Sequence, residues 1–452
     1  MSRTRTIWKK LFALSLSAVL FVLSLGGCSN PHPIDPPVNS DAAQESKTED
    51  HTMKEAEIWA EHMNVLAPFN NTTEMEGSSF DERLMAFLAG RAEGNYMASP
   101  LSFRYALGLL LSGAEGETKD ELLRALGVES EEEWTRQCLL FNGFVEAFEQ
   151  AFQEELERFR EAGEEGFLPK DSIEPYMALR VANSVWKSEA LDASFTEEYM
   201  ENAVKNYAAE YRSFLPQNVV EKVNEWARIK TEGLIEKLLP EGYNADALAV
   251  ILMNALYYKN AWLESFLKEA SAPGEFTARD GSVTEKEFMH KTESLLYYED
   301  SETQLVVLPM KGGVNMAFVL GDSRDLASKI SKATYQKVSV TIPKFDIETS
   351  FENGEFVDFL KESGVNAAFD GRADFSRMID TQVFVSDIIQ KTRIKIDEEG
   401  VEAAAVTAII MTKGMFTPEK PVEFTADRPF SFAVYAAPGE QMLTLFAGEI
   451  VE

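Results

Sequence analysis

The chain has 452 residues, of which 45% are hydrophobic, so it can bury a large core in one large domain or in two to three small ones. It carries 75 acidic residues against 43 basic ones, for a net charge of −32. Such a surface repels nucleic-acid phosphates and anionic lipid head groups, so the composition argues against nucleic acid as a partner and against electrostatic docking to membranes.

The N-terminus has the pattern of a bacterial lipoprotein signal. A basic start precedes an apolar segment over residues 11–25, which is short for a membrane span and ends in "LGGC" at Cys28. Small residues directly before a cysteine resemble a lipobox, in which the cysteine becomes the acylated N-terminus; an ordinary secretory signal with a chance cysteine is the alternative. We predict a signal peptide over 1–27 and a secreted protein, anchored through Cys28 in the lipid bilayer at the outer face of a bacterial cell membrane.

The segment after Cys28 is rich in Pro, Ser and Asp and has no hydrophobic period, so residues 28–53 are predicted to form a flexible tether. No second linker of this kind follows, and residues 54–452 are predicted to form one domain. The other cysteine, Cys138, then has no partner for a structural disulfide. It lies in an amphipathic segment and is predicted to be a small buried side chain.

The first part of that domain is predicted to be mostly helical. Apolar residues recur with helical spacing over 81–92 and 101–114, the second helix beginning near Ser99 and Pro100. "ETKDELLRALG" predicts a helix that Gly127 ends. The long acidic segment over 131–166 predicts an amphipathic helix with a charged outer face.

The second part is predicted to be mostly strands. "QLVVLPM", "VNMAFVLG" and "VSVTIPKFDIE" have strand composition, and the last alternates apolar and polar residues. "FSFAVYA", a turn at "APGE" and "MLTLFAGEIV" predict a hairpin at the C-terminus. Helices followed by long strands predict an α+β fold.

Known catalytic and metal motifs are missing from the sequence. It contains no HExxH, no GxSxG and no GxxxxGK[ST], and two cysteines are too few for a zinc ribbon. His290 is interpreted as a surface or structural histidine. We therefore expect no enzyme activity, no metal and no cofactor.

One stretch near the C-terminus is ambiguous between helix and strand. "GVEAAAVTAIIMTKGMF" runs from Gly400 to Phe416 between charged flanks. Its alanines favour helix, whereas its valine, threonine and isoleucine residues favour strand. The composition of this stretch therefore does not favour one secondary structure, and its function has to explain this ambiguity.

Several segments resemble the serpin family in the correct order. "DEEGVEAAAVTA" followed by "FTADRPFSFAVY" is similar to the serpin reactive loop and the segment after it. "NYMASPLSFRYALGLLLSGAEGET", "VANSVW", "LMNALYYKNAW" and "IPKFDIE" resemble other serpin signatures, so that the resemblance covers roughly residues 80–452. It implies the serpin fold, with three β-sheets, eight or nine helices and an exposed reactive-centre loop.

The resemblance implies a monomeric inhibitor of serine proteases that acts as a suicide substrate. The protease cleaves the exposed loop, the N-terminal part of the loop inserts into the large sheet, and the acyl-linked protease is trapped. The implied partner is a serine protease, with some cysteine proteases as further targets. The alternative is a non-inhibitory serpin that serves for binding or storage.

The resemblance also implies a hinge from which the loop inserts. Its residues are Glu398, Glu399, Gly400, Val401, Glu402, Ala403, Ala404, Ala405, Val406 and Thr407. Because strand side chains alternate, Val401, Ala405 and Thr407 should face the core after insertion, and Glu402 should face solvent. Val401 departs from the family, which usually has Thr or Ser at this position.

Two further sites are implied beneath and at the top of the sheet. The polar cluster under the sheet, called the shutter, is matched by Ser99, Ser102, Asn254 and Gln390. Gln390 stands where the family usually has His, and it can both donate and accept. The group at the top of the sheet, called the breach, is matched by Glu398, Lys344 and Trp262.

The scissile bond is implied by family spacing alone. Counted from Glu398, the usual spacing ends on Gly414 and gives the bond Gly414–Met415. Cleavage one residue earlier, after Lys413, would suit a trypsin-like enzyme. Cleavage one residue later, between Met415 and Phe416, would suit an elastase- or chymotrypsin-like enzyme, and we predict that these are inhibited faster.

Overall fold

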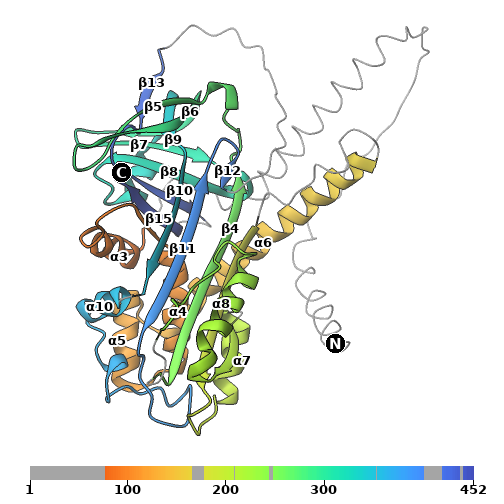
Figure 1. The fold of residues 1–452 in the computed structure, drawn as a ribbon, viewed down its shortest axis with the longest axis vertical. Coiled ribbons are helices and arrows are strands. Elements are labelled where there is room, and N and C mark those ends of the chain that lie inside the picture. Colours follow the sequence, from red (N-terminus) through yellow and green to blue (C-terminus); the bar gives the residue numbers. More distant parts are fainter. Residues whose placement is uncertain are drawn as a thin grey trace, which may run out of the picture. The chain divides into compact units, whose positions relative to one another are not determined.

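The computed structural model describes residues 77–164, 178–207, 209–243, 248–352, 354–401, 420–437 and 441–452 (Figure 1). These residues belong to one compact unit, Trp59–Glu452. The predicted signal peptide, Cys28 and the tether lie outside the described residues.

Eight α-helices occur in the described part of the chain. They are α3 (Ser79–Ala89), α4 (Pro100–Gly113), α5 (Gly116–Leu126), α6 (Glu131–Glu164), α7 (Glu197–Tyr207), α8 (Val219–Lys230), α9 (Leu326–Lys332) and α10 (Glu355–Glu362). The four predicted helices are confirmed as α3 to α6. The Ser99 hydroxyl caps α4 by accepting from the Ser102 N–H, and Gly127 ends α5 with a left-handed φ of 73°.

The first sheet has six strands and carries the candidate site. In spatial order they are β10 (Phe345–Phe351), β11 (Ile388–Ile396), β12 (Gly400–Val401), β4 (Val250–Ala261), β2 (Ala178–Ser188) and β3 (Glu210–Phe214). Helix α8 packs on one face, where Trp226 joins a buried cluster with Ile251 and Ile389. Helix α4 contacts β4 and also β15 of the other sheet, and all of its residues are buried.

The second sheet has nine strands. Its main path is β1 (Tyr96–Ala98), β15 (Leu443–Ile450), β14 (Phe430–Ala436), β8 (Val314–Gly321), β7 (Thr303–Pro309), β6 (Val283–Glu299), β9 (Thr334–Pro343) and β13 (Val422–Thr425), and β5 (Ala272–Thr277) pairs with β6. The C-terminal hairpin is confirmed as the antiparallel pair β14–β15. Strand β6 pairs with β5 and β9 over most of its length and with β7 at its end. Through β6, two of the three sheets that the resemblance implies are joined into this single nine-stranded sheet.

Cys138 is a small buried side chain, as predicted. It is 1% exposed on α6, and the Tyr105 hydroxyl donates to its carbonyl oxygen at 3.2 Å. Burial raises the pKa of the Cys138 thiol to about 12. The thiol therefore stays protonated at neutral pH and acts as a core side chain.

Candidate functional site

The candidate site lies where β11 and β4 separate within the six-stranded sheet. These strands run parallel and pair directly at two positions, Ile388 with Leu252 and Ile389 with Met253. At the other end, the short strand β12 lies between them and pairs antiparallel with both (Figure 1). Residues 390–395 of β11 and 254–259 of β4 carry no ladder pairs with each other.

Gly400 makes the entry of the chain into this gap possible. Its φ is 143°, a conformation that side chains with a Cβ rarely adopt, and an added Cβ would lie 2.3 Å from the Asn260 carbonyl oxygen. The Asp397 carboxylate accepts from the backbone N–H of Glu399 at 2.9 Å and fixes the turn. Val401 follows directly and is 1% exposed, which agrees with its implied inward direction.

The structure brings Glu398 and Lys344 together beside β12. The Lys344 ammonium lies 2.6 Å from Glu398 Oε1, to which the Ser271 hydroxyl also donates at 2.7 Å. Burial alone would raise the pKa of Glu398, but the hydrogen bonds from Lys344 and Ser271 outweigh it and hold the pKa below its usual value. Burial lowers the pKa of Lys344, but the hydrogen bonds to Glu398 and Glu287 raise it by more. The pKa of Lys344 is therefore above its usual value.

Trp262 closes the same end of the gap. It is 1% exposed, and its indole N–H donates to the Asp397 carbonyl at 2.9 Å. Its backbone N–H donates to the Glu399 carbonyl at 2.9 Å, and the Lys268 ammonium lies 2.6 Å from the Glu399 carboxylate. Residues 397–399 are therefore held by both backbone and side-chain contacts before the chain enters the sheet.

Three of the four predicted shutter residues meet at the other end of the gap. The Ser99 N–H donates to Gln390 Oε1 at 2.8 Å, and Gln390 Nε2 donates to the Ser99 carbonyl at 3.0 Å. The Ser99 hydroxyl donates to the Leu445 carbonyl at 2.6 Å and accepts from the Ser102 N–H. Gln390 thus uses both its donor and its acceptor, and ties β11 to the start of α4.

Asn254 is buried but is not bonded to the other three. Its side-chain N–H donates to the side-chain oxygen of Asn183 on the neighbouring strand β2, and the Asn183 side-chain N–H donates to the Tyr207 carbonyl at 2.8 Å. The side-chain oxygen of Asn254 has no donor within the part of the chain that the structure describes. It is an unsatisfied buried acceptor beside the gap.

Sequence reasoning missed four residues that bond in and around the gap. They are Asn183, Ser271 and Asp397, described above, and Thr392 of β11, whose hydroxyl donates to the Met97 carbonyl at 2.9 Å. Asn183 could have been found, because it is a polar residue inside the apolar strand "VANSVW". Ser271 and Thr392 act through single hydrogen bonds to segments distant in sequence, which no local pattern indicates. The Asp397 carboxylate accepts from the N–H groups of Glu399 and Gly400, so a local turn motif could have indicated it.

The remaining predicted residues lie outside the described residues. These are Glu402, Ala403, Ala404, Ala405, Val406 and Thr407 of the hinge, and Lys413, Gly414, Met415 and Phe416 around the implied scissile bond. Among the described residues there is no group of His, Cys, Asp and Glu that could hold a metal ion. No helix in the same residues is long and apolar enough to cross a membrane.

Comparisons with known proteins agree on one family. A family model described as "Serpin (serine protease inhibitor)" matches residues 78–452. Serpin-ZXA of Oryza sativa subsp. japonica is 31% identical, with 83% of this chain and 96% of the relative covered. Leukocyte elastase inhibitor of Equus caballus is 29% identical, with 78% and 92% covered.

Solved structures show the same fold. Serpin48 of the insect Tenebrio molitor has a TM-score of 0.65 at 26% identity, over 83% of this chain and 96% of that one. Thyroxine-binding globulin in complex with thyroxine has a TM-score of 0.62 at 19% identity, over 83% and 97%, and shows the fold alone. The chain belongs to the serpin family.

Proposed function

We propose that this serpin inhibits serine proteases as a suicide substrate, by inserting the segment after Val401 between β11 and β4. The observation that carries the proposal is β12, since Gly400 and Val401 already lie between these strands and pair with both. Beyond Val401, both neighbours continue as strands without pairing to each other. The gap therefore offers hydrogen-bonding edges to a further antiparallel strand.

The register of β12 defines how many residues after Val401 could pair with β11 and β4 before they reach the positions where these two strands pair with each other. Val401 pairs with Asn260 on one side and with Ile396 on the other. Extending both ladders one residue at a time fills the open stretch with residues 402–407. Residue 408 would then meet the existing pair of Ile389 with Met253, so deeper insertion requires that pair to open.

The same register would place Thr407 opposite both Gln390 and Asn254. Both side chains are buried, being 3% and 4% exposed, and Gln390 reaches Ser99 at the start of α4, on the face opposite to α8. The Thr407 hydroxyl can donate to the Asn254 side-chain oxygen, which has no donor among the described residues. Insertion would thus satisfy an acceptor that the present arrangement leaves unpaired.

The free energy available from insertion is large. A strand that makes about a dozen net hydrogen bonds at roughly 0.5–1.5 kcal/mol each gains on the order of 6–18 kcal/mol. This is comparable with the stability of a whole domain. Such a gain can drive the displacement of an acyl-linked protease.

The test is to mix the purified domain with a panel of serine proteases and to look for complexes that resist SDS. Formation of a covalent complex with at least one protease supports inhibition by trapping. Cleavage of the loop by every protease tested, without complex formation and without a rise in melting temperature, would instead support a non-inhibitory binding or storage serpin.

We propose elastase- or chymotrypsin-like enzymes as the favoured targets, with some cysteine proteases as further ones. The relative named leukocyte elastase inhibitor supports this choice, as does the bond Gly414–Met415 or its neighbour after Met415. Mass spectrometry of the released C-terminal peptide identifies the bond. A peptide that begins at Gly414 would show cleavage after Lys413 and would reverse the ranking in favour of trypsin-like enzymes.

We also propose that the mature protein is anchored through acylated Cys28, with its domain on the outer side of a bacterial membrane. The support is the sequence "LSLGGCSN" and the tether that follows. A Cys28→Ser variant should leave the membrane fraction and appear in soluble or uncleaved form. Unchanged partitioning of this variant into the detergent phase would refute the anchor.

A further inference from the structure

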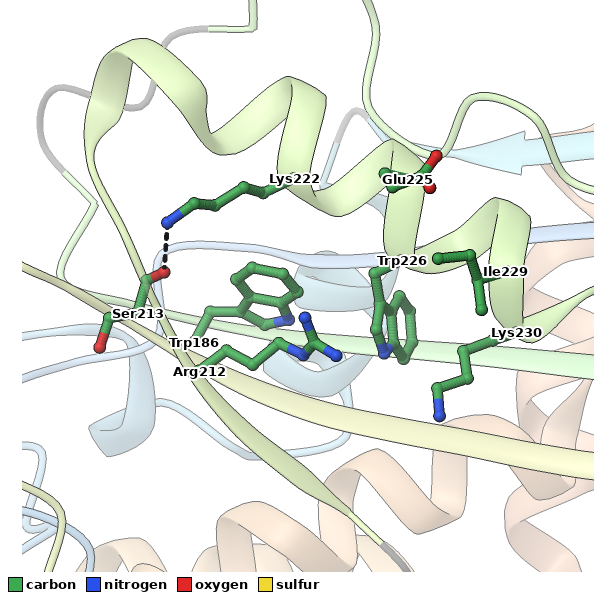
Figure 2. A pocket seen from close by; sticks show the side chains of 8 residues that line it. All are labelled: Trp186, Arg212, Ser213, Lys222, Glu225, Trp226, Ile229 and Lys230. Atoms are coloured by element: carbon green, nitrogen blue, oxygen red, sulfur yellow. Dashed lines mark hydrogen bonds between the residues drawn. The ribbon is translucent and has the colours of Figure 1, made fainter. Parts of the chain in front are cut away.

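A cavity of about 420 Å³ lies between helix α8 and strands β2 and β3, away from the gap between β11 and β4 (Figure 2). Its lining residues are Trp186, Arg212, Ser213, Lys222, Glu225, Trp226, Ile229 and Lys230. The volume is that of many water molecules and falls in the range of small-molecule sites. None of the residues described at the gap between β11 and β4 lines this cavity.

The two indoles that line the cavity differ in their hydrogen bonding. Trp186 is 1% exposed, and its indole N–H donates to the Ser184 hydroxyl at 2.8 Å. Trp226 is 2% exposed, and its indole N–H has no acceptor among the described residues. A buried donor without an acceptor is costly, and here it borders a space that can hold an acceptor.

The charged groups around the cavity are mainly cationic on the side of the indoles. Figure 2 shows the Arg212 guanidinium between the rings of Trp186 and Trp226, near the edge of Trp226 that carries the nitrogen. Lys230 and Arg212 share the carboxylate of Glu210, and each has further N–H groups that can donate to another acceptor. Lys222 donates to the Ser213 carbonyl at 3.2 Å and also lies 3.8 Å from Glu189.

Glu225 is the carboxylate among the described residues that line the cavity, and it is bonded within its own helix. Both oxygens of Glu225 accept from Arg228 on the same helix, each at 2.9 Å. The donors Arg212, Lys222, Lys230 and Trp226 also line the cavity. The three cations already have the acceptors Glu210, Glu189 and the Ser213 carbonyl, whereas the Trp226 indole N–H has none among the described residues. Such a site is unusual on a chain whose net charge is −32.

We propose that this cavity binds a small aromatic carboxylate. The carboxylate accepts from the Arg212 guanidinium and the Trp226 indole N–H, with the Lys230 ammonium nearby. The flat ring packs against the Ile229 side chain and the edges of the two indoles that line the cavity, because edge-to-face contacts between aromatic rings are favourable. The site is independent of the proposed insertion of the loop.

The test is isothermal titration of the domain with 2-naphthoate, and with 2-naphthamide as the uncharged analogue. We expect saturable binding of 2-naphthoate with a Kd below about 1 mM, and at least about 10-fold weaker binding of the amide. Absence of saturable binding at that concentration, or equal binding of the two compounds, would overturn the proposal.

Variants locate the binding. Arg212→Gln removes a partly exposed side chain and should weaken binding of 2-naphthoate at least about 10-fold, whereas Trp226→Phe should weaken it roughly 2- to 10-fold. Lys237→Gln makes the same change of charge at an exposed lysine that pairs with Glu241, and should leave the Kd unchanged. Equal weakening by Lys237→Gln and Arg212→Gln would show general surface attraction and refute a defined site.

Circular dichroism and thermal melts of each variant test whether the fold is kept. Trp226 is a core residue, so a loss of binding by Trp226→Phe counts only with an unchanged spectrum. Arg212 is partly exposed and provides the decisive result, since its substitution leaves the core intact.

Discussion

The two ends of the gap between β11 and β4 are closed by different kinds of interaction. Next to β12, charged groups dominate: Glu398 binds Lys344, and Glu399 binds Lys268. At the other end, neutral groups form the closure, with Gln390 bonded twice to Ser99 and apolar pairs beyond it. Ion pairs near solvent weaken with salt and pH, whereas buried neutral hydrogen bonds do not. The two ends should therefore respond to different perturbations.

The largest effect is expected for a charge placed within the open stretch itself. Thr407→Arg would bury an unpaired guanidinium next to Gln390 and Asn254, which costs about 3–5 kcal/mol. Insertion then slows, the acyl-enzyme hydrolyses, and the stoichiometry of inhibition should rise several-fold. The measurement adds increasing amounts of the variant to a protease that the parent inhibits and follows the remaining protease activity.

Ala404→Arg is the matched control for this prediction. The alternation of strand side chains directs residue 404 to the opposite face, and the register extended from β12 would place it opposite the half-exposed Arg393, where its charge would stay in water. Its stoichiometry of inhibition should remain close to that of the parent. Equal effects of the two arginines would show that the register extended from β12 is wrong.

At the end that contains β12, Gly400→Ala should have the next largest effect. The added Cβ would meet the Asn260 carbonyl at 2.3 Å, and the residue would have to hold a φ of 143°. We expect a loss of about 3 kcal/mol in the free energy of unfolding, measured by urea denaturation.

Gly143→Ala is the control, since Gly143 lies within α6 and the added Cβ would meet no described atom within 4 Å beyond its own helix backbone and chain neighbours. It should be neutral or stabilise by about 0.5–1 kcal/mol, because alanine favours helix. If Gly143→Ala lost as much unfolding free energy as Gly400→Ala, the loss at Gly400 could not be attributed to its position at β12.

At the neutral end, Gln390→Leu should cost about 2 kcal/mol of unfolding free energy. It removes both bonds to Ser99 and leaves a buried N–H without an acceptor. Gln390→His keeps one donor and one acceptor and should cost less. The loss for Gln390→Leu should be the same at low and high salt; a strong dependence on salt would break the contrast between the two ends.

The smallest effect is expected for the charged end, and it should depend on pH. The hydrogen bonds that outweigh burial hold the pKa of Glu398 below its usual value in the folded state. Its contribution to stability is therefore complete above the unfolded pKa of about 4.3, and it is lost as the pH falls through the lower folded pKa. Glu398→Gln should cost about 1 kcal/mol at pH 7 and progressively less below pH of about 4.

The control for this pH dependence is Glu221→Gln, which changes an exposed glutamate on α8. Its stability curve should run parallel to that of the parent between pH 7 and pH 3. If the Glu398→Gln curve also runs parallel, the ion pair with Lys344 contributes nothing that depends on pH.

Local chemistry in the sequence was sufficient for much of the fold. Helices α3 to α6 and the hairpin β14–β15 follow from residue periodicity and capping, which depend on neighbours a few positions apart. Gly400 and Val401 could be identified as an entry to the sheet because the ordered serpin motifs surround them. The contact between Glu398 and Lys344 was implied by the same resemblance.

Only the tertiary structure decided how these parts meet. Asn254 bonds to Asn183 instead of joining Ser99, and its side-chain oxygen lacks a donor in the described part of the chain. Likewise, Trp186 and Trp226 look like two ordinary core residues in the sequence, and their different hydrogen bonding depends on Ser184 and on the packing of α8 against β2 and β3. Periodicity fixes which face of an element is buried, but the partner of a buried polar atom depends on groups distant in sequence, whose distances only the folded chain sets.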